Sequence, residues 1–260
     1  DLPKNTKRLP QVLNMEEKII YDINNNFRLC GIINNVTCSE EIVVICHART
    51  SNKDSRPTRK IADYLSKNNI NNFRFDFVGC GESNGDYKDY TVSNMINNLN
   101  GSLEMLMEKY NYKSFILIGC SMGGRIVANV DANKFNIKKI ILWYPAIDYK
   151  RKIFNIPSRK ELIAKRNGFI PIENNWKLSY EYFKDERKNN TFKIIKNMKT
   201  PLLFIHGTKD PFVNYKTSEI LSKNCLDSKL CLINNGDHGF HSEDNMNEAL
   251  KETLNFIKHN

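Results

Sequence analysis

Residues 115–124 have the sequence Phe-Ile-Leu-Ile-Gly-Cys-Ser-Met-Gly-Gly, and a segment with helical character follows over residues 125–129. An apolar run that leads into the pattern G-x-S-x-G and then into a helix is typical of a nucleophile elbow, the sharp turn that presents a reactive serine. Ser121 occupies the serine position of this pattern. The alternative interpretation is a glycine-rich turn between a strand and a helix that carries no chemistry.

The residues around Ser121 suit such a turn. A serine hydroxyl is a weak nucleophile at neutral pH, so it must stand clear of the backbone and close to a base. We expect Ser121 to adopt a positive φ, and Gly119 and Gly123, which have no Cβ, leave room for that conformation. The backbone N–H of Met122 follows the serine and can donate to a developing oxyanion. Cys120 is a weaker candidate nucleophile, because the motif puts the serine at the apex of the turn.

Two later segments supply a candidate acid and a candidate base. Asp210 comes after the apolar run 202–205, and His238 comes after the apolar-containing run 229–233. Because the carboxyl ends of parallel strands meet at one edge of a sheet, we expect these side chains to converge with Ser121. Serine, aspartate and histidine in this chain order can form a catalytic triad of nucleophile, acid and base.

Other acids and histidines are alternatives for these roles. Asp237 adjoins His238 and would have difficulty reaching back to that imidazole, whereas Asp148 is a possible substitute acid. His241 is a second possible base, although it lies at the expected start of the last helix. His206 lies at the end of a strand, and we expect it to be structural.

Strand-like and helix-like segments alternate along the chain with short links. Strands are expected over 17–22, 27–33, 41–46, 72–77, 115–118, 139–144, 201–205 and 229–233, and helices over 58–67, 91–110, 125–129, 215–221 and 243–258. This alternation predicts an α/β fold, with a mostly parallel sheet covered by helices on both faces. The first two strands flank Asn24, Asn25 and Asn26, a hairpin signal, and should form an antiparallel edge.

One interruption is too long for an ordinary connection between a strand and a helix. Residues 147–199 are therefore expected to form a helical lid, inserted into a core made of residues 1–146 and 200–260. The aromatic residues of this segment are either the lid's own core or contacts to a substrate. The segment holds 14 Lys and Arg against 6 Asp and Glu. That excess is either a solvated surface or a basic face for an anionic substrate or an acidic protein.

Composition narrows the class of protein. The 260 residues are 40% hydrophobic, which is enough for one large domain with a sizeable core, and the formal net charge is +10. No apolar run approaches the roughly 18 residues that a membrane helix needs, and no nucleic-acid-binding motif accompanies the positive charge. Seven cysteines without a CxxC pair indicate reduced thiols rather than a zinc site. We expect a cytoplasmic protein without a signal peptide, metal or cofactor.

Five segments together resemble the α/β-hydrolase superfamily, and within it the cinnamoyl/feruloyl esterase-type and monoacylglycerol-lipase-like serine hydrolases. The resemblance spans residues 42–257 and rests on segments 46–50 (Cys-His-Ala-Arg-Thr), 74–83 (Arg-Phe-Asp-Phe-Val-Gly-Cys-Gly-Glu-Ser), 119–124, 206–210 (His-Gly-Thr-Lys-Asp) and 236–240 (Gly-Asp-His-Gly-Phe). These segments are specific for the fold and the triad but not for the substrate. The resemblance implies an α/β-hydrolase fold with an eight-stranded sheet and a helical lid insertion.

The resemblance also implies roles for individual residues. Ser121 corresponds to the nucleophile, Asp210 to the acid and His238 to the base, while the backbone N–H groups of Arg49 and Met122 correspond to the oxyanion donors. His47 is expected to shape the oxyanion loop and to line the substrate site. The family usually has His-Gly-aromatic where this chain has His-Ala-Arg at 47–49. The side chain of Arg49 would either meet a substrate carboxylate or phosphate or fold away into a salt bridge.

The sequence thus predicts a serine hydrolase that cleaves short or medium acyl esters, or aryl esters, through an acyl-enzyme. The main alternative is a thioesterase or acyltransferase acting on acyl chains bound to coenzyme A or to an acidic acyl carrier protein. A third possibility is an inactive hydrolase fold that only binds ligands. Peptidase and lactonase activities also stay open, and the oligomeric state is not predicted.

Overall fold

The computed structural model describes residues 16–23, 27–147, 158–172 and 175–259. Its centre is a sheet of eight strands in the order β1-β2-β4-β3-β5-β6-β9-β10. The pairs β1–β2 and β2–β4 are antiparallel and all the others are parallel, as the sequence predicts. The strands are β1 (Glu16–Ile23), β2 (Phe27–Asn34), β3 (Glu41–Cys46), β4 (Asn72–Phe75), β5 (Ser114–Cys120), β6 (Ile137–Trp143), β9 (Leu202–Gly207) and β10 (Ser228–Ile233).

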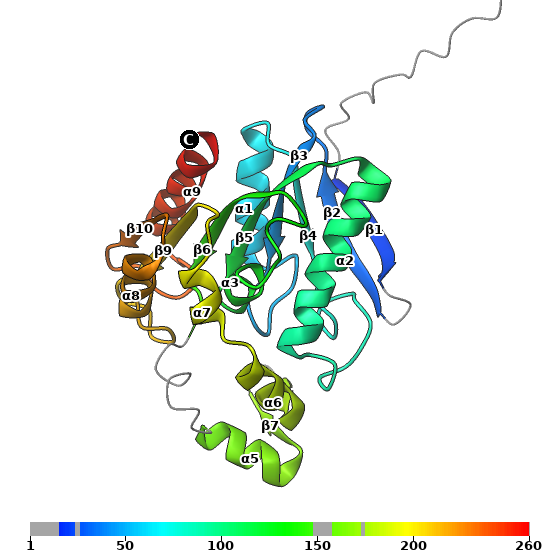
Figure 1. Ribbon diagram of the computed structural model, residues 1–260, viewed down its shortest axis with the longest axis vertical. Helices are drawn as coiled ribbons and strands as arrows, with labels where there is room; N and C mark the ends of the chain where they lie inside the picture. Colours follow the sequence, from blue (N-terminus) through cyan, green and yellow to red (C-terminus); the bar gives the residue numbers. More distant parts are fainter. Residues whose placement is uncertain (1–15, 24–26, 148–157, 173–174, 260) are drawn as a thin grey trace, which may run out of the picture.

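Helices cover both faces of this sheet (Figure 1). One face packs against α1 (Arg56–Lys67) and α9 (Glu243–Lys258), and the other packs against α2 (Val92–Tyr110), α3 (Met122–Val127) and α8 (Lys216–Asn224). Because both faces are covered, the central parallel strands contain continuous apolar runs, such as residues 42–46 of β3 and 115–118 of β5, rather than an alternating pattern. Helix α2 shows the expected helical spacing, and its apolar stripe is fully buried: Met95, Leu99, Leu103 and Leu106.

The segment between β6 and β9 forms an insertion, which we define as the described residues from 158 to 199. It contains α5 (Arg159–Asn167), β7 (Phe169–Pro171), β8 (Lys177–Ser179), α6 (Tyr180–Lys188) and α7 (Thr191–Lys196). Alongside the expected helices, β7 and β8 pair as a small antiparallel sheet. In Figure 1, α5, α6 and β7 lie beyond one end of the main sheet, on the side where α3 begins.

Aromatic side chains attach the insertion to the main body. The rings of Trp176 and Tyr182 lie 5.5 and 6.2 Å from the ring of Tyr90, which is fully buried. The ring of Phe169 lies 5.9 Å from that of Tyr87. Aromatic pairs at such distances contribute about 0.5–1.5 kcal/mol each beyond their buried area. These rings therefore form a packed junction between the insertion and the loop that precedes α2.

The strand expected over 72–77 ends two residues earlier, at Phe75. The backbone N–H of Phe77 leaves the sheet to donate to the ring of His47, and the side chain of Asp76 turns toward Lys53. All seven cysteines are free, and four of them are buried. Among the described helices, none combines the length and the apolar character needed to cross a membrane.

Candidate active site

The turn between β5 and α3 has the strained geometry that the sequence predicts. Ser121 has φ 53° and ψ −108°, a conformation that L-residues rarely adopt. A Cβ on Gly119 would lie 2.4 Å from the carbonyl oxygen of Gly123, and a Cβ on Gly123 would lie 2.2 Å from that of Cys46. The turn is thus closed so tightly that only glycine fits at both positions. It lifts Ser121 out of the strand into a pocket.

Three side chains from three different strand ends form one chain of hydrogen bonds. The Nε2 atom of His238 lies 3.2 Å from the Oγ of Ser121, and its Nδ1 lies 2.6 Å from the Oδ2 of Asp210. The carboxylate oxygen accepts a hydrogen bond from Nδ1, so a neutral imidazole carries its proton on Nδ1 and Nε2 keeps a free lone pair. That lone pair faces the serine hydroxyl. The arrangement can remove the hydroxyl proton as the oxygen attacks an electrophile.

Asp210 is held as a carboxylate by its surroundings. Burial alone would raise its pKa, but hydrogen bonds from His206 and His238 and from the backbone N–H of Val213 hold the pKa well below the usual range. The N–H groups of Phe212 and Val213 donate to Oδ1 at 2.8 and 2.9 Å. With Oδ1 fixed by the backbone, Oδ2 is left to point at the two imidazoles. This carboxylate therefore stays ionised and fixed in direction.

His206 is the second histidine on Asp210. Its ring is fully buried, and its Nε2 lies 3.1 Å from Oδ2 of Asp210 and 3.0 Å from the carbonyl oxygen of Val213. Both of these atoms are acceptors, so Nε2 carries the proton. The Nδ1 atom then accepts from the hydroxyl of Ser218, which lies 2.7 Å away. The expectation that His206 is structural agrees with its burial, but its partner is the candidate catalytic acid itself.

Two backbone N–H groups border the pocket beside Ser121. Met122 begins α3, so its N–H has no acceptor within the helix, and Arg49 lies in the loop after β3. Neither N–H donates to an acceptor among the described residues. Two such donors near a serine are the usual composition of an oxyanion hole.

His47 differs from the expectation that it lines the substrate site. Its ring is fully buried, with Nδ1 2.7 Å from the carbonyl oxygen of Ala48 and Nε2 accepting from the N–H of Phe77 at 3.1 Å. Burial lowers its pKa, so the ring stays neutral. The described pocket lining contains its neighbours Ala48 and Arg49 but not His47. The ring instead braces the loop that carries the N–H of Arg49.

The pocket around Ser121 has a volume of about 580 Å³, within the usual range for small-molecule sites. Arg125, one helical turn after Ser121, is buried and pairs with Glu186 of the insertion. Burial raises the pKa of Tyr182 to about 12, so its hydroxyl stays protonated in the wall. The residues that line this pocket include Arg49, Ser121, Lys160, Tyr182, Phe212 and His238.

The alternative residues have other surroundings. His241 is exposed and pairs with Asp237 at 2.9 Å, so this acid does not serve His238. Asp148 lies outside the described residues. Burial raises the pKa of the Cys120 thiol to about 12, which keeps it protonated and unreactive. No cluster of three or more potential metal ligands occurs among the residues that the structure describes.

Four side chains that shape the site were not predicted from the sequence. Phe212 is 69% exposed, and its ring lies 5.4 Å from that of His238 at the pocket. Tyr144 packs against the same imidazole at 4.5 Å and has φ 37°. Arg125 could have been found from its i+4 spacing from Ser121 on one helix face. Glu186 carries no comparable signal, because it reaches the pocket only through the docking of the insertion.

Comparisons with known proteins agree with this fold. The model of the family described as serine aminopeptidase, S33, matches residues 37–181. The structure titled as ferulic acid bound to Est1E from Butyrivibrio proteoclasticus is similar, with a TM-score of 0.77, 20% identity, and 93% of this chain and 100% of that chain covered. No curated protein sequence matches significantly.

Two further solved structures have the same fold. Alpha/beta hydrolase domain-containing protein 10 from mouse has a TM-score of 0.78 and 16% identity, with 93% of this chain and 98% of that chain covered. An esterase from Pyrococcus furiosus has a TM-score of 0.71 and 21% identity, with 94% and 90% covered. At such identities the likeness bears on the fold alone.

Proposed function

This chain belongs to the serine aminopeptidase S33 family of α/β-hydrolases, and from that premise we propose that it is a serine hydrolase that cleaves carboxylic esters. The observation that carries the proposal is the hydrogen-bonded chain from Ser121 through His238 to Asp210, open to a pocket. Two unused N–H donors at the same pocket strengthen it, because an ester carbonyl needs such donors when its oxygen becomes negative.

In the first half-reaction, Oγ of Ser121 attacks the ester carbonyl carbon while Nε2 of His238 takes the hydroxyl proton. Asp210 stabilises the resulting imidazolium without taking its proton. The N–H groups of Arg49 and Met122 donate to the oxyanion, and one such donor is typically worth about 3 kcal/mol. The intermediate collapses when the bond to the alcohol oxygen breaks, and His238 gives its proton to that alcohol.

In the second half-reaction, water replaces the alcohol. His238 takes a proton from the water as its oxygen attacks the acyl-enzyme carbonyl. The second tetrahedral intermediate breaks the bond to Oγ, and the proton returns to Ser121. The acid product is released. The same steps act on a thioester if a thiol leaves in place of the alcohol.

The charges of the pocket favour esters over amino-terminal peptides. An aminopeptidase has to accommodate a protonated amine, which requires an acidic partner. Glu186 is the acidic side chain among the described lining residues, and it already pairs with Arg125. The exposed lining cations Arg49 and Lys160 would repel an amine. We therefore rank ester hydrolysis above the aminopeptidase activity for which the family is named.

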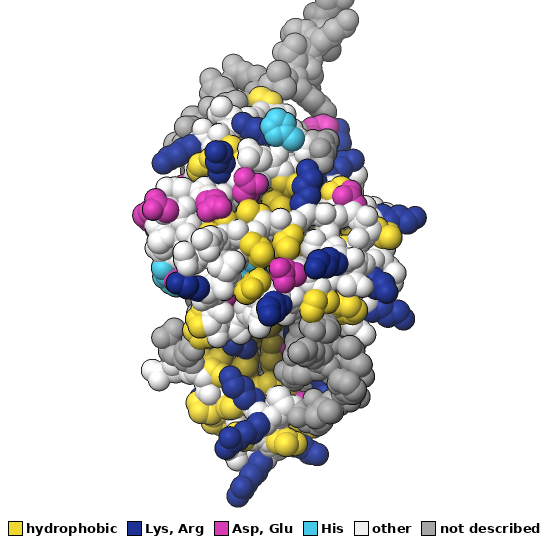
Figure 2. Space-filling view, turned by 90° about the vertical axis from the view of Figure 1, so that its left-hand side faces the viewer, with side chains coloured by type: hydrophobic (Ala, Val, Ile, Leu, Met, Phe, Trp, Pro, Cys, Tyr) yellow, Lys and Arg dark blue, Asp and Glu magenta, His cyan; other side chains and the backbone are white. Residues whose placement is uncertain are grey.

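The basic insertion favours a second candidate, a thioesterase or acyltransferase acting on acyl chains that an acidic carrier protein presents. Its 14 basic residues against 6 acidic ones over 147–199 would attract such a carrier. Figure 2 shows Lys and Arg side chains spread over the lobe that the insertion forms. Turnover of carrier-bound acyl chains that falls with salt, beside salt-insensitive turnover of free esters, would favour this candidate.

The test of the proposal compares Ser121→Ala with Cys120→Ala. S121A should lose labelling by a fluorophosphonate and nearly all turnover of p-nitrophenyl butyrate, while C120A should keep both because its thiol is buried, stays protonated and does not line the pocket. Circular dichroism should show both variants folded. Wild-type turnover in S121A would refute the nucleophile assignment, and failure of the wild-type protein to label would favour a ligand-binding protein without activity.

A further inference from the structure

Two positive side chains at the pocket have no counter-ion within the described protein. Arg49 and Lys160 line the cavity and are exposed, and neither has a carboxylate within ion-pair distance among the described residues. They come from different parts of the fold, the loop after β3 and helix α5 of the insertion. Two cations from separate segments that meet at one opening raise the local concentration of anions there.

The described acidic side chains of the insertion cannot neutralise them, because each already has a partner. Glu161 pairs with Arg187, Glu181 with Lys184 and Glu186 with Arg125, and Asp185 accepts two hydrogen bonds from Ser93. Arg125 provides the contrast within the same pocket, since its charge is already balanced. The unbalanced positive charge thus lies on the exposed lining residues Arg49 and Lys160, at the mouth of the pocket, and not on Arg125 of helix α3.

Arg49 is also fixed close to the reacting atoms. Its own backbone N–H is one of the two proposed oxyanion donors, so its side chain starts beside the position of the substrate carbonyl. The guanidinium also lies near enough to the hydroxyl of Tyr182 to act against the rise in that residue's pKa. A guanidinium and a protonated phenol together offer several donors to a carboxylate or phosphate oxygen.

We infer that the pocket selects esters or thioesters that carry an anionic group, a carboxylate or phosphate, which Arg49 and Lys160 hold at the mouth while Ser121 attacks the carbonyl. This inference rests on the proposed function and adds the substrate class. Phe212, exposed beside His238, provides an apolar contact for the part of the substrate between the two ends. The anionic group belongs either to the acyl part or to the leaving group, and both are recognised by the same chemistry.

The experiment compares neutral and anionic substrates of similar size. p-Nitrophenyl valerate is the neutral reference, mono-p-nitrophenyl glutarate has a carboxylate on the acyl side, and a carboxy-nitrophenyl valerate has it on the leaving group. Valeryl-coenzyme A adds phosphates on the leaving group. The measured quantity is a ratio of kcat/KM values. For each anionic ester, kcat/KM is divided by the value for p-nitrophenyl valerate. For valeryl-coenzyme A, kcat/KM is divided by the value for a neutral thioester of valerate.

Three variants test the side chains. Arg49→Gln and Lys160→Gln should each lower this ratio by about threefold to fivefold for one anionic substrate class, mainly through KM, as expected for exposed ion pairs. Arg49→Lys should retain most of the ratio because it keeps the charge. Arg59→Gln is the matched control, since Arg59 is exposed on α1 and absent from the pocket lining. Added salt should shrink the wild-type ratio, because the Debye length is about 8 Å at physiological ionic strength.

The outcomes separate the two proposals. If Ser121 is labelled and esters are hydrolysed, but R49Q and K160Q keep the wild-type ratio for every anionic substrate, the inference is wrong and the proposed function stands. If Ser121 is not labelled and no ester or thioester is hydrolysed, the proposed function fails and the inference fails with it. A drop in the ratio confined to the glutarate ester identifies the acyl side as anionic, and a drop confined to the other substrates identifies the leaving group.

Discussion

Among the described residues, two aspartates have side chains with no exposed surface, and their hydrogen-bond partners differ in kind. Asp76 follows β4 and Asp210 follows β9. Both carboxylates accept backbone and side-chain hydrogen bonds. Asp76 accepts from the N–H groups of Lys53 and Glu82 at 2.6 and 2.9 Å and from the ammonium of Lys53 at 3.0 Å. Burial and hydrogen-bond satisfaction therefore do not distinguish a structural acid from a catalytic one.

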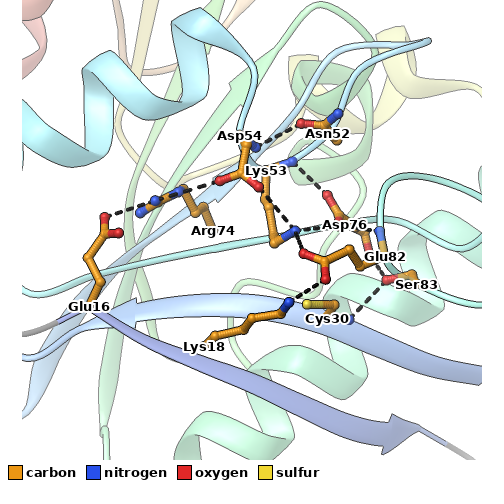
Figure 3. Close-up of polar contacts among 10 residues, drawn as sticks. All are labelled: Glu16, Lys18, Cys30, Asn52, Lys53, Asp54, Arg74, Asp76, Glu82 and Ser83. Carbon is orange, nitrogen blue, oxygen red and sulfur yellow. Dashed lines mark hydrogen bonds and ion pairs between the residues drawn. The ribbon is translucent and has the colours of Figure 1, made fainter.

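The partners make the difference. Figure 3 shows Asp76 inside a network of fixed charges in which Lys53 also meets Glu82 and Asp54. Burial would lower the pKa of Lys53, but these carboxylates hold it above the usual value, so the lysine keeps its proton. Asp210 instead faces two imidazoles, and imidazole is the side chain that gains and loses a proton near neutral pH. One of them, His238, reaches the pocket.

The two networks also act on different parts of the molecule. The contacts of Asp76 join the loop after β3 to the loop after β4, and through Glu82 they reach Lys18 on the edge strand β1. They hold elements of the fold together. The contacts of Asp210 lead through His238 to the hydroxyl of Ser121, which lines the pocket and has no other hydrogen-bond partner among the described residues. We therefore expect substitutions at the two aspartates to have opposite signatures in activity and in stability.

The largest expected effect is the loss of activity in Asp210→Asn. The amide keeps the size of the side chain but offers an N–H to His238, which favours the wrong tautomer of the imidazole. In other triads this change lowers kcat about 10⁴-fold. We expect a similar loss of kcat per folded molecule on p-nitrophenyl butyrate. The urea midpoint should also fall, but by much less than in an unfolding variant, because the folded protein holds the pKa of Asp210 low and therefore favours a carboxylate over a neutral group at this position. A variant that retained more than a tenth of the wild-type kcat would exclude Asp210 as the catalytic acid.

Asp76→Asn should show the reverse signature. The side chain of Lys53 is 2% exposed and would lose its buried partner, and breaking a buried ion pair on one side typically costs about 3–5 kcal/mol. Glu82 and Asp54 remain, so we expect a loss near the lower end of that range, measured as the free energy of unfolding in urea. The kcat of the molecules that stay folded should fall far less than in D210N. An unchanged urea midpoint would remove the structural role assigned to Asp76.

This contrast was only partly accessible from the sequence. Asp210 and His238 were predictable because each follows an apolar strand, and parallel strands bring such residues to one edge. The buried position of Asp76 was not predicted, since the segment 72–77 has the pattern of a continuous strand. The strand ends at Phe75: the N–H of Asp76 still donates to the carbonyl oxygen of Cys30 in β2, but the N–H of Phe77 donates to the ring of His47 instead of to a neighbouring strand.

The pocket was less predictable than the triad. The strands β7 and β8 have three residues each, too few for a periodic pattern to be recognised. The contact between Glu186 and Arg125 joins residues 61 positions apart, and it depends on how the insertion docks. His47 was expected to line the site because of its place after a strand, but the orientation of its ring is decided by the N–H of Phe77. Side-chain direction within loops is set by tertiary contacts that a sequence pattern does not contain.

The smallest expected effect is a partial loss of kcat when His206, the second imidazole on Asp210, is replaced. Its buried ring does not line the pocket, so we infer that it acts only by positioning Asp210. His206→Phe keeps a buried ring but removes the donor to Oδ2, and the carboxylate can then rotate away from His238. Misplacement of a catalytic group lowers the rate by up to about 100-fold. We therefore expect H206F to lower kcat by about 10-fold to 100-fold and to leave KM unchanged.

A conservative variant separates positioning from a merely structural role. The side-chain amide of His206→Gln can still donate to Asp210, so this variant should recover part of the kcat that H206F loses. A structural role alone would lower the urea midpoint of both variants, since neither has an acceptor for the hydroxyl of Ser218 in the same place, and it would leave kcat per folded molecule unchanged. The opposite outcome is that kcat in the two variants follows the urea midpoint and not the presence of a donor to Asp210. In that case the backbone N–H bonds alone position Asp210. His206 would then be a structural partner of a buried acid, as Lys53 is for Asp76.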